Sequence, residues 1–332
     1  MERRPAPACG PTDVVIRVAA AGICHTDFVS MRGQHSAMRY PTVLGHEFSG
    51  VVETCGQSVT HLKPGDRVTS LSYAYCGTCM SCRRGQHTAC RNALSMPFNL
   101  DGAFQELVRM PAIAVFAIAD SFSLEEAALT EPAANGYAAA ERGGIFPGER
   151  VVVIGPGPVG LLALQAAALR QPADLIVLGT RRERLEMAAA LGATQVVNVR
   201  ETDPYRAIME LTDGAGADVV LFCGGGEDAW EVAGRALAPH GRVVVEGLPE
   251  TPDTKWPVPV FDFTSKQISY LGVSGYTGAH FGAVLHLLEA GKIKAAPLIT
   301  HRFALEDYRK AFETVEQRAG GAMKVLFRIG DE

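Results

Sequence analysis

The feature of this 332-residue sequence that most constrains its fold is a glycine-rich turn inside an uncharged stretch. Val151–Leu169 is nominally long enough to span a membrane, but glycines and prolines interrupt it directly after Ile154. The stretch therefore predicts a strand over Val151–Ile154, a tight turn, and a helix over 159–170. The turn matches the pattern GxGxxG, which is typical of a dinucleotide site when it joins a strand to a helix.

Glycines at such a turn let the backbone approach a pyrophosphate, and the helix that follows offers free N–H groups and a positive dipole end to that anion. A purely structural Gly-Pro turn is the alternative. The candidate cofactor-binding residues of the turn are Gly155, Gly157, Pro158, Val159 and Gly160.

Strands and helices alternate after this turn. Short apolar runs predict strands, and the longer segments between them predict helices over 181–191, 204–212 and 227–237. This alternation predicts a doubly wound parallel sheet over residues 133–274. The predicted strands are Leu175–Leu178, Val196–Val197, Asp218–Phe222 and Val243–Val245.

The chain before about residue 130 has short alternating apolar runs such as Val14–Val18, which predict strands joined by turns. The segment after Tyr276 carries an amphipathic helix at Phe281–Ala290, a strand at Leu298–Thr300, a helix near 306–317 and a strand at Val325–Phe327. This tail is too short to fold alone. We therefore predict an α/β chain in which the parallel sheet is inserted into a mostly β domain formed by residues 1–132 and 275–332.

Composition excludes several classes of protein. Hydrophobic residues make up 47% and charged residues 20% of the chain, as in ordinary globular proteins. The net charge of −5 comes from interspersed acids and bases, so neither nucleic acid nor a membrane surface is an expected partner. The first residues lack the apolar core of a secretory signal, which predicts a cytoplasmic location.

Four of the eight cysteines lie within fifteen residues, in the pattern CxxCxxCx7C. Short spacings of this kind let thiolates converge on one tetrahedral metal ion, whereas clustered free thiols would be prone to oxidation. A site closed by four thiolates has no open position for substrate, so we predict a structural zinc in the loop 76–90. Its ligands would be Cys76, Cys79, Cys82 and Cys90.

A second group of metal-ligand residue types is scattered along the chain. Cys24, His46, Glu47 and Glu131 are each weak candidates alone, since a histidine beside a glycine is commonly a turn residue. Together they form a thiolate, imidazole and carboxylate set that suits Zn²⁺, and three ligands leave one position open. We predict a catalytic zinc held by Cys24, His46 and a carboxylate from Glu47 or Glu131. The sequence does not decide which of the two carboxylates binds the metal directly.

The order of these motifs resembles the zinc-dependent medium-chain dehydrogenase/reductase family, the alcohol dehydrogenase superfamily, over nearly the whole chain. Glutamate rather than cysteine at position 131 is similar to its sorbitol and threonine dehydrogenase branch. The resemblance implies a GroES-like catalytic domain, a Rossmann domain, an active site in the cleft between them, and a homodimer or homotetramer.

The chain departs from the family pattern at two places. It has only about a dozen residues before Val14, where family members carry about two additional strands. Val29 stands where the family often has the histidine that ends a proton relay. The relay from Thr26 would then end on water, on a ribose hydroxyl, or on His25 or His35. We count His25 among the cofactor-binding candidates.

These residues predict reversible hydride transfer between a secondary alcohol, such as a polyol, sugar or amino alcohol, and NAD(P). Zinc would polarise the substrate oxygen, Thr26 would accept its proton, and Asp27 would orient a zinc ligand. The alternatives are an NADPH-dependent aldehyde or ketone reductase and a non-enzymatic zinc module. Cys9, Cys55 and Cys223 are expected to be buried small residues.

The end of the second strand of the parallel sheet indicates which cofactor is preferred. NAD-preferring domains carry an acid there, which repels a 2′-phosphate, but this chain has Gly179. Thr180, Arg181 and Arg182 follow, and their hydroxyl and guanidinium groups could hold a phosphate. The alternative is that both arginines are solvated residues of a helix. We predict NADP in preference to NAD, together with two zinc ions per chain.

Overall fold

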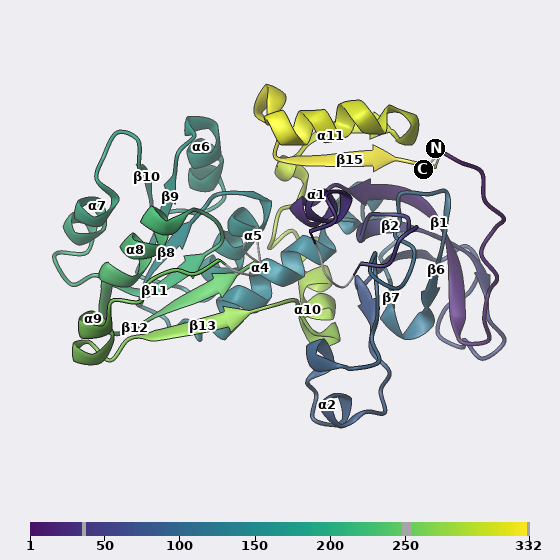
Figure 1. Cartoon of the computed structure of the whole chain (residues 1–332), viewed down its shortest axis with the longest axis horizontal. Helices are drawn as coiled ribbons and strands as arrows, with labels where there is room; N and C mark the ends of the chain where they lie inside the picture. The colour runs from purple at the N-terminus through teal and green to yellow at the C-terminus, as the bar shows by residue number, and fades with distance from the viewer. Residues whose placement is uncertain (35–37, 248–253, 331–332) are drawn as a thin grey trace. The chain divides into compact units, whose positions relative to one another are not determined.

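The computed structural model describes residues 1–34, 38–247 and 254–330. The chain divides into two compact units, one formed by Met1–Glu131 with Tyr276–Glu332 and the other by Pro132–Gly275. In Figure 1 the second unit is coloured teal to green, and the first unit is purple to blue with a yellow return. The boundaries expected from the sequence differ from these by one residue on each side.

The first unit is built on a seven-stranded sheet around β1 (Asp13–Gly22). β1 is apolar except for Arg17 and its end residues, and it pairs antiparallel with β2 (Glu47–Cys55), β6 (Leu107–Pro111) and β15 (Lys324–Arg328). The pairing with β15 returns the C-terminal segment to the N-terminal sheet, as predicted. The sheet is completed by β3 (Arg67–Ser70), β7 (Val115–Ala117) and β14 (Ile299–Ala304).

Short helices and one small hairpin surround this sheet. α1 follows β1 directly, and α2 lies in a lobe next to the hairpin of β4 and β5 (Figure 1). The helices of the unit are α1 (His25–Met31), α2 (Met80–Arg83), α3 (Leu124–Ala127), α10 (Gly278–Glu289) and α11 (Tyr308–Gln317), and the hairpin strands are β4 (Tyr73–Ala74) and β5 (Leu94–Ser95). α4 (Thr130–Arg142) begins at the boundary between the two units.

The second unit contains the predicted parallel sheet, in the strand order β10-β9-β8-β11-β12-β13. This is the doubly wound order, with the first strand next to the point where the order reverses. The strands are β8 (Arg150–Ile154), β9 (Asp174–Gly179), β10 (Gln195–Asn198), β11 (Ala217–Phe222), β12 (Leu237–Glu246) and β13 (Ser269–Val273). The helices are α5 (Pro158–Ala168), α6 (Arg182–Ala190), α7 (Pro204–Leu211), α8 (Glu227–Arg235) and α9 (Val260–Ser265).

Three elements of this unit were missing from the sequence-based prediction, namely α4, α9 and β13. β13 reads Ser-Tyr-Leu-Gly-Val and lacks the continuous β-branched run of a strand buried on both faces. It is the edge strand of the sheet, and its residues are half-buried or exposed.

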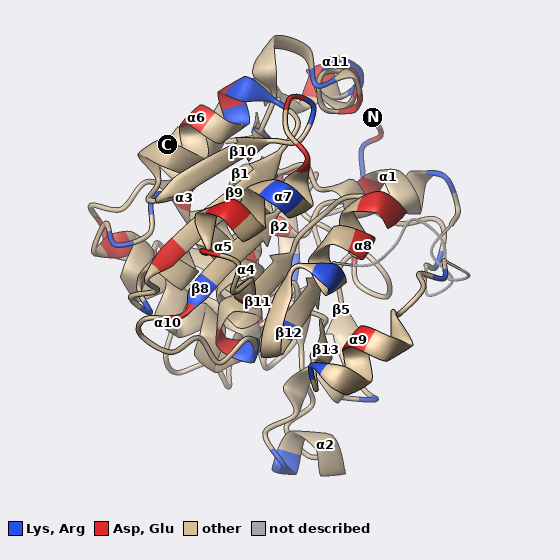
Figure 2. Ribbon diagram, turned by 90° about the vertical axis from the view of Figure 1, so that its left-hand side faces the viewer, with Lys and Arg blue, Asp and Glu red and all other residues tan. Residues whose placement is uncertain are grey.

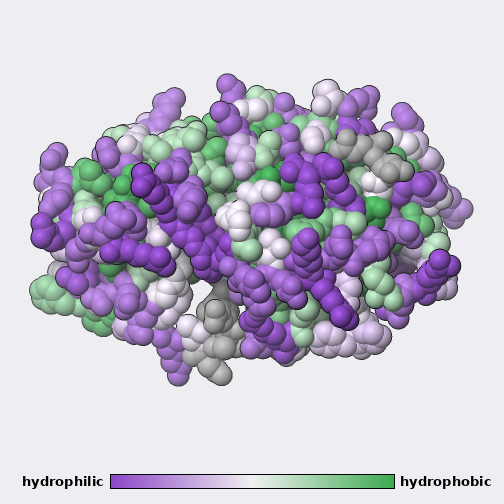
Figure 3. Space-filling view, turned by 90° about the horizontal axis from the view of Figure 1, so that it is seen from above, coloured by the Kyte–Doolittle hydropathy of each residue, from purple (hydrophilic) through white to green (hydrophobic). Residues whose placement is uncertain are grey.

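The surface shows no separation of charge or polarity in the views drawn. Basic and acidic residues are interspersed along the helices in Figure 2. Hydrophilic and hydrophobic residues are also mixed over the face displayed in Figure 3. Among the described residues, none of the helices is long and apolar enough to cross a bilayer.

Close helix packing in the second unit gives a test of the fold. A Cβ at Gly136 in α4 would lie 2.6 Å from the backbone nitrogen of Ala163 in α5. We expect Gly136→Ala to lower the free energy of unfolding by about 1–3 kcal/mol, because the two helices must separate. Urea denaturation measures this change.

The matched control is the same substitution at Gly282 in α10. A Cβ there would lie 3.5 Å from Phe116, an ordinary contact, so Gly282→Ala should stabilise the protein by up to about 1 kcal/mol. Equal effects of the two substitutions would contradict the described packing of α4 on α5.

Candidate metal centres and dinucleotide loop

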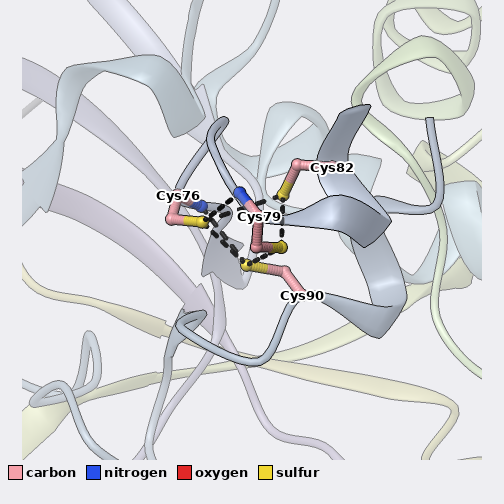
Figure 4. Close-up of side chains that lie close together, drawn as sticks. All are labelled: Cys76, Cys79, Cys82 and Cys90. Atoms are coloured by element: carbon pink, nitrogen blue, oxygen red, sulfur yellow. Dashed lines mark hydrogen bonds between the residues drawn. The ribbon is translucent and has the colours of Figure 1, made fainter. Parts of the chain in front are cut away.

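The four cysteines of the predicted structural site converge in the lobe around α2 (Figure 4). The Sγ–Sγ distances are 3.5 Å for Cys76–Cys90 and Cys79–Cys82, 3.9 Å for Cys79–Cys90 and 4.0 Å for Cys76–Cys82. A tetrahedron with Zn–S bonds of about 2.3 Å has edges of roughly 3.8 Å. The sulfur positions therefore fit a tetrahedral zinc ion.

Local hydrogen bonds to two of these sulfurs stabilise the thiolate form. The Cys79 N–H donates to Cys76 Sγ and the Cys76 N–H donates to Cys90 Sγ, each over 3.4 Å. Hydrogen bonds led by the Thr78 hydroxyl lower the pKa of Cys76 to about 5. Burial and the neighbouring sulfurs instead raise the pKa of Cys82, so four thiolates together require a bound cation.

The second predicted set forms a compact group in the first unit. One ligand atom each from Cys24, His46 and Glu47 lies within 4.8 Å of the other two. The register of β1 and β2 accounts for this, because Gly22 pairs with Glu47 and Cys24 follows as the N-cap of α1. Residues from two separate chain segments, Cys24 and His46–Glu47, are thus brought to one point.

Asp27 holds the backbone on both sides of this group. Its carboxylate is fully buried and accepts hydrogen bonds from the N–H of Cys24 (2.9 Å) and of Gly45 (3.1 Å). Its distance to His46 Nδ1 is 3.8 Å, too long for a hydrogen bond. Asp27 therefore orients the segments that carry the ligands rather than the imidazole itself.

His46 lies in a strongly negative environment. Burial opposes its protonation, but the charges of Cys24, Asp27 and Glu131 raise the pKa of His46 well above its usual value. Its buried Nδ1 has no hydrogen-bond partner among the described residues. A divalent cation such as Zn²⁺ would balance this negative charge, and it binds the thiolate, imidazole and carboxylate groups that are present.

The two candidate carboxylates are held by different partners. Both oxygens of Glu47 accept hydrogen bonds from Lys324 Nζ, over 2.8 and 2.6 Å. Glu131, at the start of α4, is buried and hydrogen-bonded to the Tyr276 hydroxyl, and burial raises its pKa. Glu131 is outside the group of three ligand atoms, so the geometry favours Glu47 as the metal-bound carboxylate.

The relay candidates lie on the first turns of α1. Thr26 is half-buried, with Oγ1 3.7 Å from Cys24 Sγ, and His25 is exposed. Val29 is half-buried, and His35 lies outside the described residues. Thr26 is thus the relay candidate that contacts the metal-ligand group.

The glycine-rich turn connects β8 to α5 as predicted. Gly155 has φ +92°, and a Cβ there would lie 2.9 Å from the Gly224 nitrogen. A Cβ at Gly160 would lie 2.1 Å from the Gly155 carbonyl oxygen, so only glycine allows this packing. Gly157 is the N-cap of α5, and Pro158 and Val159 begin the helix.

The sequence-based prediction missed a second glycine run at this turn. Gly224–Gly226 follows β11, the strand that neighbours β8, and brings its backbone against Gly155. The sequence signal for this run was three consecutive glycines one residue after the predicted strand Asp218–Phe222. A backbone without side chains at both strand ends leaves room for a ligand to approach closely.

The last position of β9, Gly179, is constrained by the glycine turn itself. A Cβ at Gly179 would lie 2.6 Å from Cγ of Pro156, so an acidic side chain does not fit there while the turn keeps its conformation. Thr180 is exposed, and Arg181 is the half-buried N-cap of α6. Arg182 is exposed and forms a 3.1 Å ion pair with Glu186.

One of the remaining expectations about single residues needs correction. Cys9 is exposed, and Cys55 and Cys223 are only half-buried as whole residues, so the prediction of three buried cysteines is wrong. Tyr276 is 1% exposed, and its hydroxyl is hydrogen-bonded to Ser72 and Glu131. Its phenol lies in the protein interior because those partners satisfy its hydroxyl.

Comparison with known proteins agrees with this architecture. The family described as "Alcohol dehydrogenase GroES-like domain" matches residues 10–120, and "Zinc-binding dehydrogenase" matches residues 158–290. The chain therefore belongs to the zinc-dependent medium-chain alcohol dehydrogenases, in the sorbitol and threonine dehydrogenase-like branch. As a member of that class it is an enzyme, a zinc-dependent alcohol oxidoreductase, and the hypothesis of a non-enzymatic zinc module is wrong.

Individual relatives match over almost their full length. An L-threonine 3-dehydrogenase from Bacillus licheniformis is 34% identical, covering 97% of this chain and 93% of the relative. A sorbitol dehydrogenase from Bacillus subtilis is 33% identical, covering 98% and 93%. A zinc-binding dehydrogenase structure from Sinorhizobium meliloti, bound to NADP, superposes with a TM-score of 0.90 at 30% identity, covering 97% and 93%.

The cysteine lobe gives a test that does not depend on activity. We expect Cys79→Ala to lose one zinc ion per chain and to lower the melting temperature, because a structural site contributes to folding stability. Metal analysis of the purified protein and a thermal melt measure the two effects. Cys9→Ala, which removes an exposed thiol, should leave both unchanged. Full zinc content in Cys79→Ala would contradict the assignment.

Proposed function

We propose that this enzyme catalyses reversible hydride transfer between the secondary alcohol of a polyol or an amino alcohol and NADP. The observation that carries the proposal is the group of Cys24, His46 and Glu47, whose ligand atoms suit one zinc ion and do not close a tetrahedron. Similarity to threonine and sorbitol dehydrogenases supports the substrate class. In the reverse direction the same site would act as a ketone reductase.

In this proposal the cysteine lobe holds one zinc ion and the Cys24 group holds another. A zinc ion at the second site supplies a Lewis acid that lowers the pKa of a substrate hydroxyl. Thr26 accepts the hydroxyl proton and passes it outward, since its Oγ1 lies next to Cys24 Sγ. Asp27 keeps the ligand segments in place through two backbone N–H groups.

Glu131 has a separate role in this proposal. Its carboxylate lies close enough to His46 and Glu47 to alter their charge balance, and the Tyr276 hydroxyl fixes its orientation. A second carboxylate beside the metal ligands can hold a water molecule or a substrate hydroxyl by accepting a hydrogen bond from it. This arrangement suits substrates that carry more than one hydroxyl or amino group.

The dinucleotide would bind along the glycine turn of the second unit. The first turn of α5 offers N–H groups to the pyrophosphate, and Gly155, Gly160 and Gly224 keep the approach free of side chains. We propose NADP because Gly179 provides no acid and Pro156 leaves no space for one. Thr180, Arg181 and Arg182 would surround the 2′-phosphate.

Assembly and location complete the proposal. We propose a homo-oligomer, supported by the open edge strand β13 and by the neighbouring helix α9, where Val260 is 71% and Phe261 is 82% exposed. We also propose a cytoplasmic location, because two thiol sets that must stay reduced to bind metal suit a reducing compartment.

Substitution of the proposed catalytic ligands tests the zinc mechanism. We expect Cys24→Ala and His46→Ala each to reduce kcat/KM by about 10³-fold or more, because the Lewis acid contributes several kcal/mol. Steady-state oxidation of threonine, sorbitol and related alcohols measures this loss. Far-UV circular dichroism should stay unchanged, and Cys9→Ala serves as the matched control. Retained turnover in either ligand variant would contradict the mechanism.

The cofactor proposal is tested at Arg181. We expect Arg181→Ala to lower kcat/KM for NADP by about 10- to 100-fold while leaving kcat/KM for NAD nearly unchanged, because a charge-assisted bond to the 2′-phosphate is lost. The control is Arg206→Ala, which removes an exposed arginine paired with Glu210 on α7. A wild type that prefers NAD, with no loss of NADP use in Arg181→Ala, would overturn the preference.

A further inference from the structure

Lys324 is a buried lysine that the proposed reaction does not use. It begins β15, and its side chain is 4% exposed. Its ammonium donates to both oxygens of Glu47, over 2.8 and 2.6 Å, and to the carbonyl of Ile23 over 3.3 Å. Ile23 directly precedes Cys24. One cation therefore contacts both the carboxylate and the chain segment that supply ligands to the proposed metal site.

The strands around Lys324 are built to hold the Glu47 carboxylate in this place. Gly22 of β1 pairs with Glu47, and a Cβ at Gly22 would lie 2.2 Å from Glu47 Oε2. Only glycine at that position leaves room for the carboxylate. On the other side of β1, the Ile23 N–H donates to the Val325 carbonyl, which fixes the start of β15 beside it.

A buried carboxylate needs a counter-charge, and Glu47 has two candidates for it. Its side chain is 1% exposed, so an ionised Glu47 with no cation nearby would be strongly unfavourable. A bound metal ion would supply the charge in the loaded enzyme, and Lys324 supplies it in the absence of metal. A metal ion held by Glu47 would compete with the ammonium for the same carboxylate, so each would weaken the interaction of the other with Glu47.

Among the residues that the structure describes, no lysine or arginine is hydrogen-bonded to a sulfur of the cysteine lobe. The partners described for its four sulfurs are backbone N–H groups, the Thr78 hydroxyl, the Asn92 amide and one another. All of these are neutral donors or further ligands. A metal ion at the lobe therefore meets no resident cation that competes for its ligands.

We infer that Lys324 is a positioning residue that acts as an internal counter-ion to Glu47, keeping the metal-free site folded and making the metal at Cys24, His46 and Glu47 exchangeable. This inference rests on the proposed zinc site. Lys324 and the metal ion would both interact with the Glu47 carboxylate, so each would weaken the binding of the other, which is a negative coupling free energy. Removal of the ammonium should destabilise the metal-free protein more than the metal-loaded protein, and so tighten metal binding by linkage.

The test is Lys324→Met, with Lys292→Met, an exposed lysine, as matched control. Chelator competition measures the affinity for Zn²⁺, and the ion at the catalytic site is the one lost in Cys24→Ser. We expect the Kd of that ion to fall about tenfold or more in Lys324→Met. The melting temperature should fall more in the metal-free than in the zinc-loaded protein. Lys324→Arg, which keeps the charge, should stay close to wild type in both measurements.

An unchanged or weaker zinc affinity in folded Lys324→Met would overturn the inference. If Lys324→Met does not fold without metal, folding on addition of Zn²⁺ supports the inference. If it does not fold even with Zn²⁺, the double variant Lys324→Met/Glu47→Gln decides: a folded double variant identifies the unpaired carboxylate as the cause, and an unfolded one overturns the inference. A wild type that binds no zinc at Cys24 would instead contradict the proposed function itself.

Discussion

The structure of the first unit depends on neutralising buried negative charge at one point. Cys24, Asp27, Glu47 and Glu131 gather around His46, and the carboxylates of Asp27 and Glu47 are almost completely buried. Several ionisable groups of one sign are unfavourable in the protein interior unless cations and hydrogen-bond donors compensate them. Asp27 accepts hydrogen bonds from two backbone N–H groups, Glu47 accepts them from Lys324, and Glu131 is hydrogen-bonded to the Tyr276 hydroxyl. In the proposed function, a divalent metal ion would complete the compensation and supply the Lewis acid for the reaction.

This charge balance explains why the first unit is assembled from both ends of the chain. β1 is the strand on which the site is built: it leads into Cys24, pairs through Gly22 with Glu47, and pairs with β15, which carries Lys324. Residues 277 positions apart in sequence thereby form one ion pair. In the second unit the site depends on the backbone instead, since two glycine runs keep side chains away from the carboxyl ends of β8 and β11.

Local spacing in the sequence was sufficient to predict the fold class, the cysteine lobe and the glycine turn. The residue types of the second metal set were also visible, but not that Glu47 rather than Glu131 joins Cys24 and His46. That distinction depends on the register of β1 and β2, which spacing does not encode. Lys324 was missed for the same reason, because a lysine in an apolar strand gives no signal of its partner. Gly179 was interpreted from a missing acid, whereas the structure adds that Pro156 occupies the space.

In the proposed function, a zinc ion binds between Cys24, His46 and Glu47 in addition to the one in the cysteine lobe. Anomalous diffraction at the zinc edge, from crystals of the zinc-loaded protein, tests it most directly. The account predicts two anomalous peaks per chain, one of them about 2.0–2.3 Å from Cys24 Sγ, a His46 ring nitrogen and a Glu47 oxygen. A single peak at the cysteine lobe, with fully loaded and active enzyme, would contradict it.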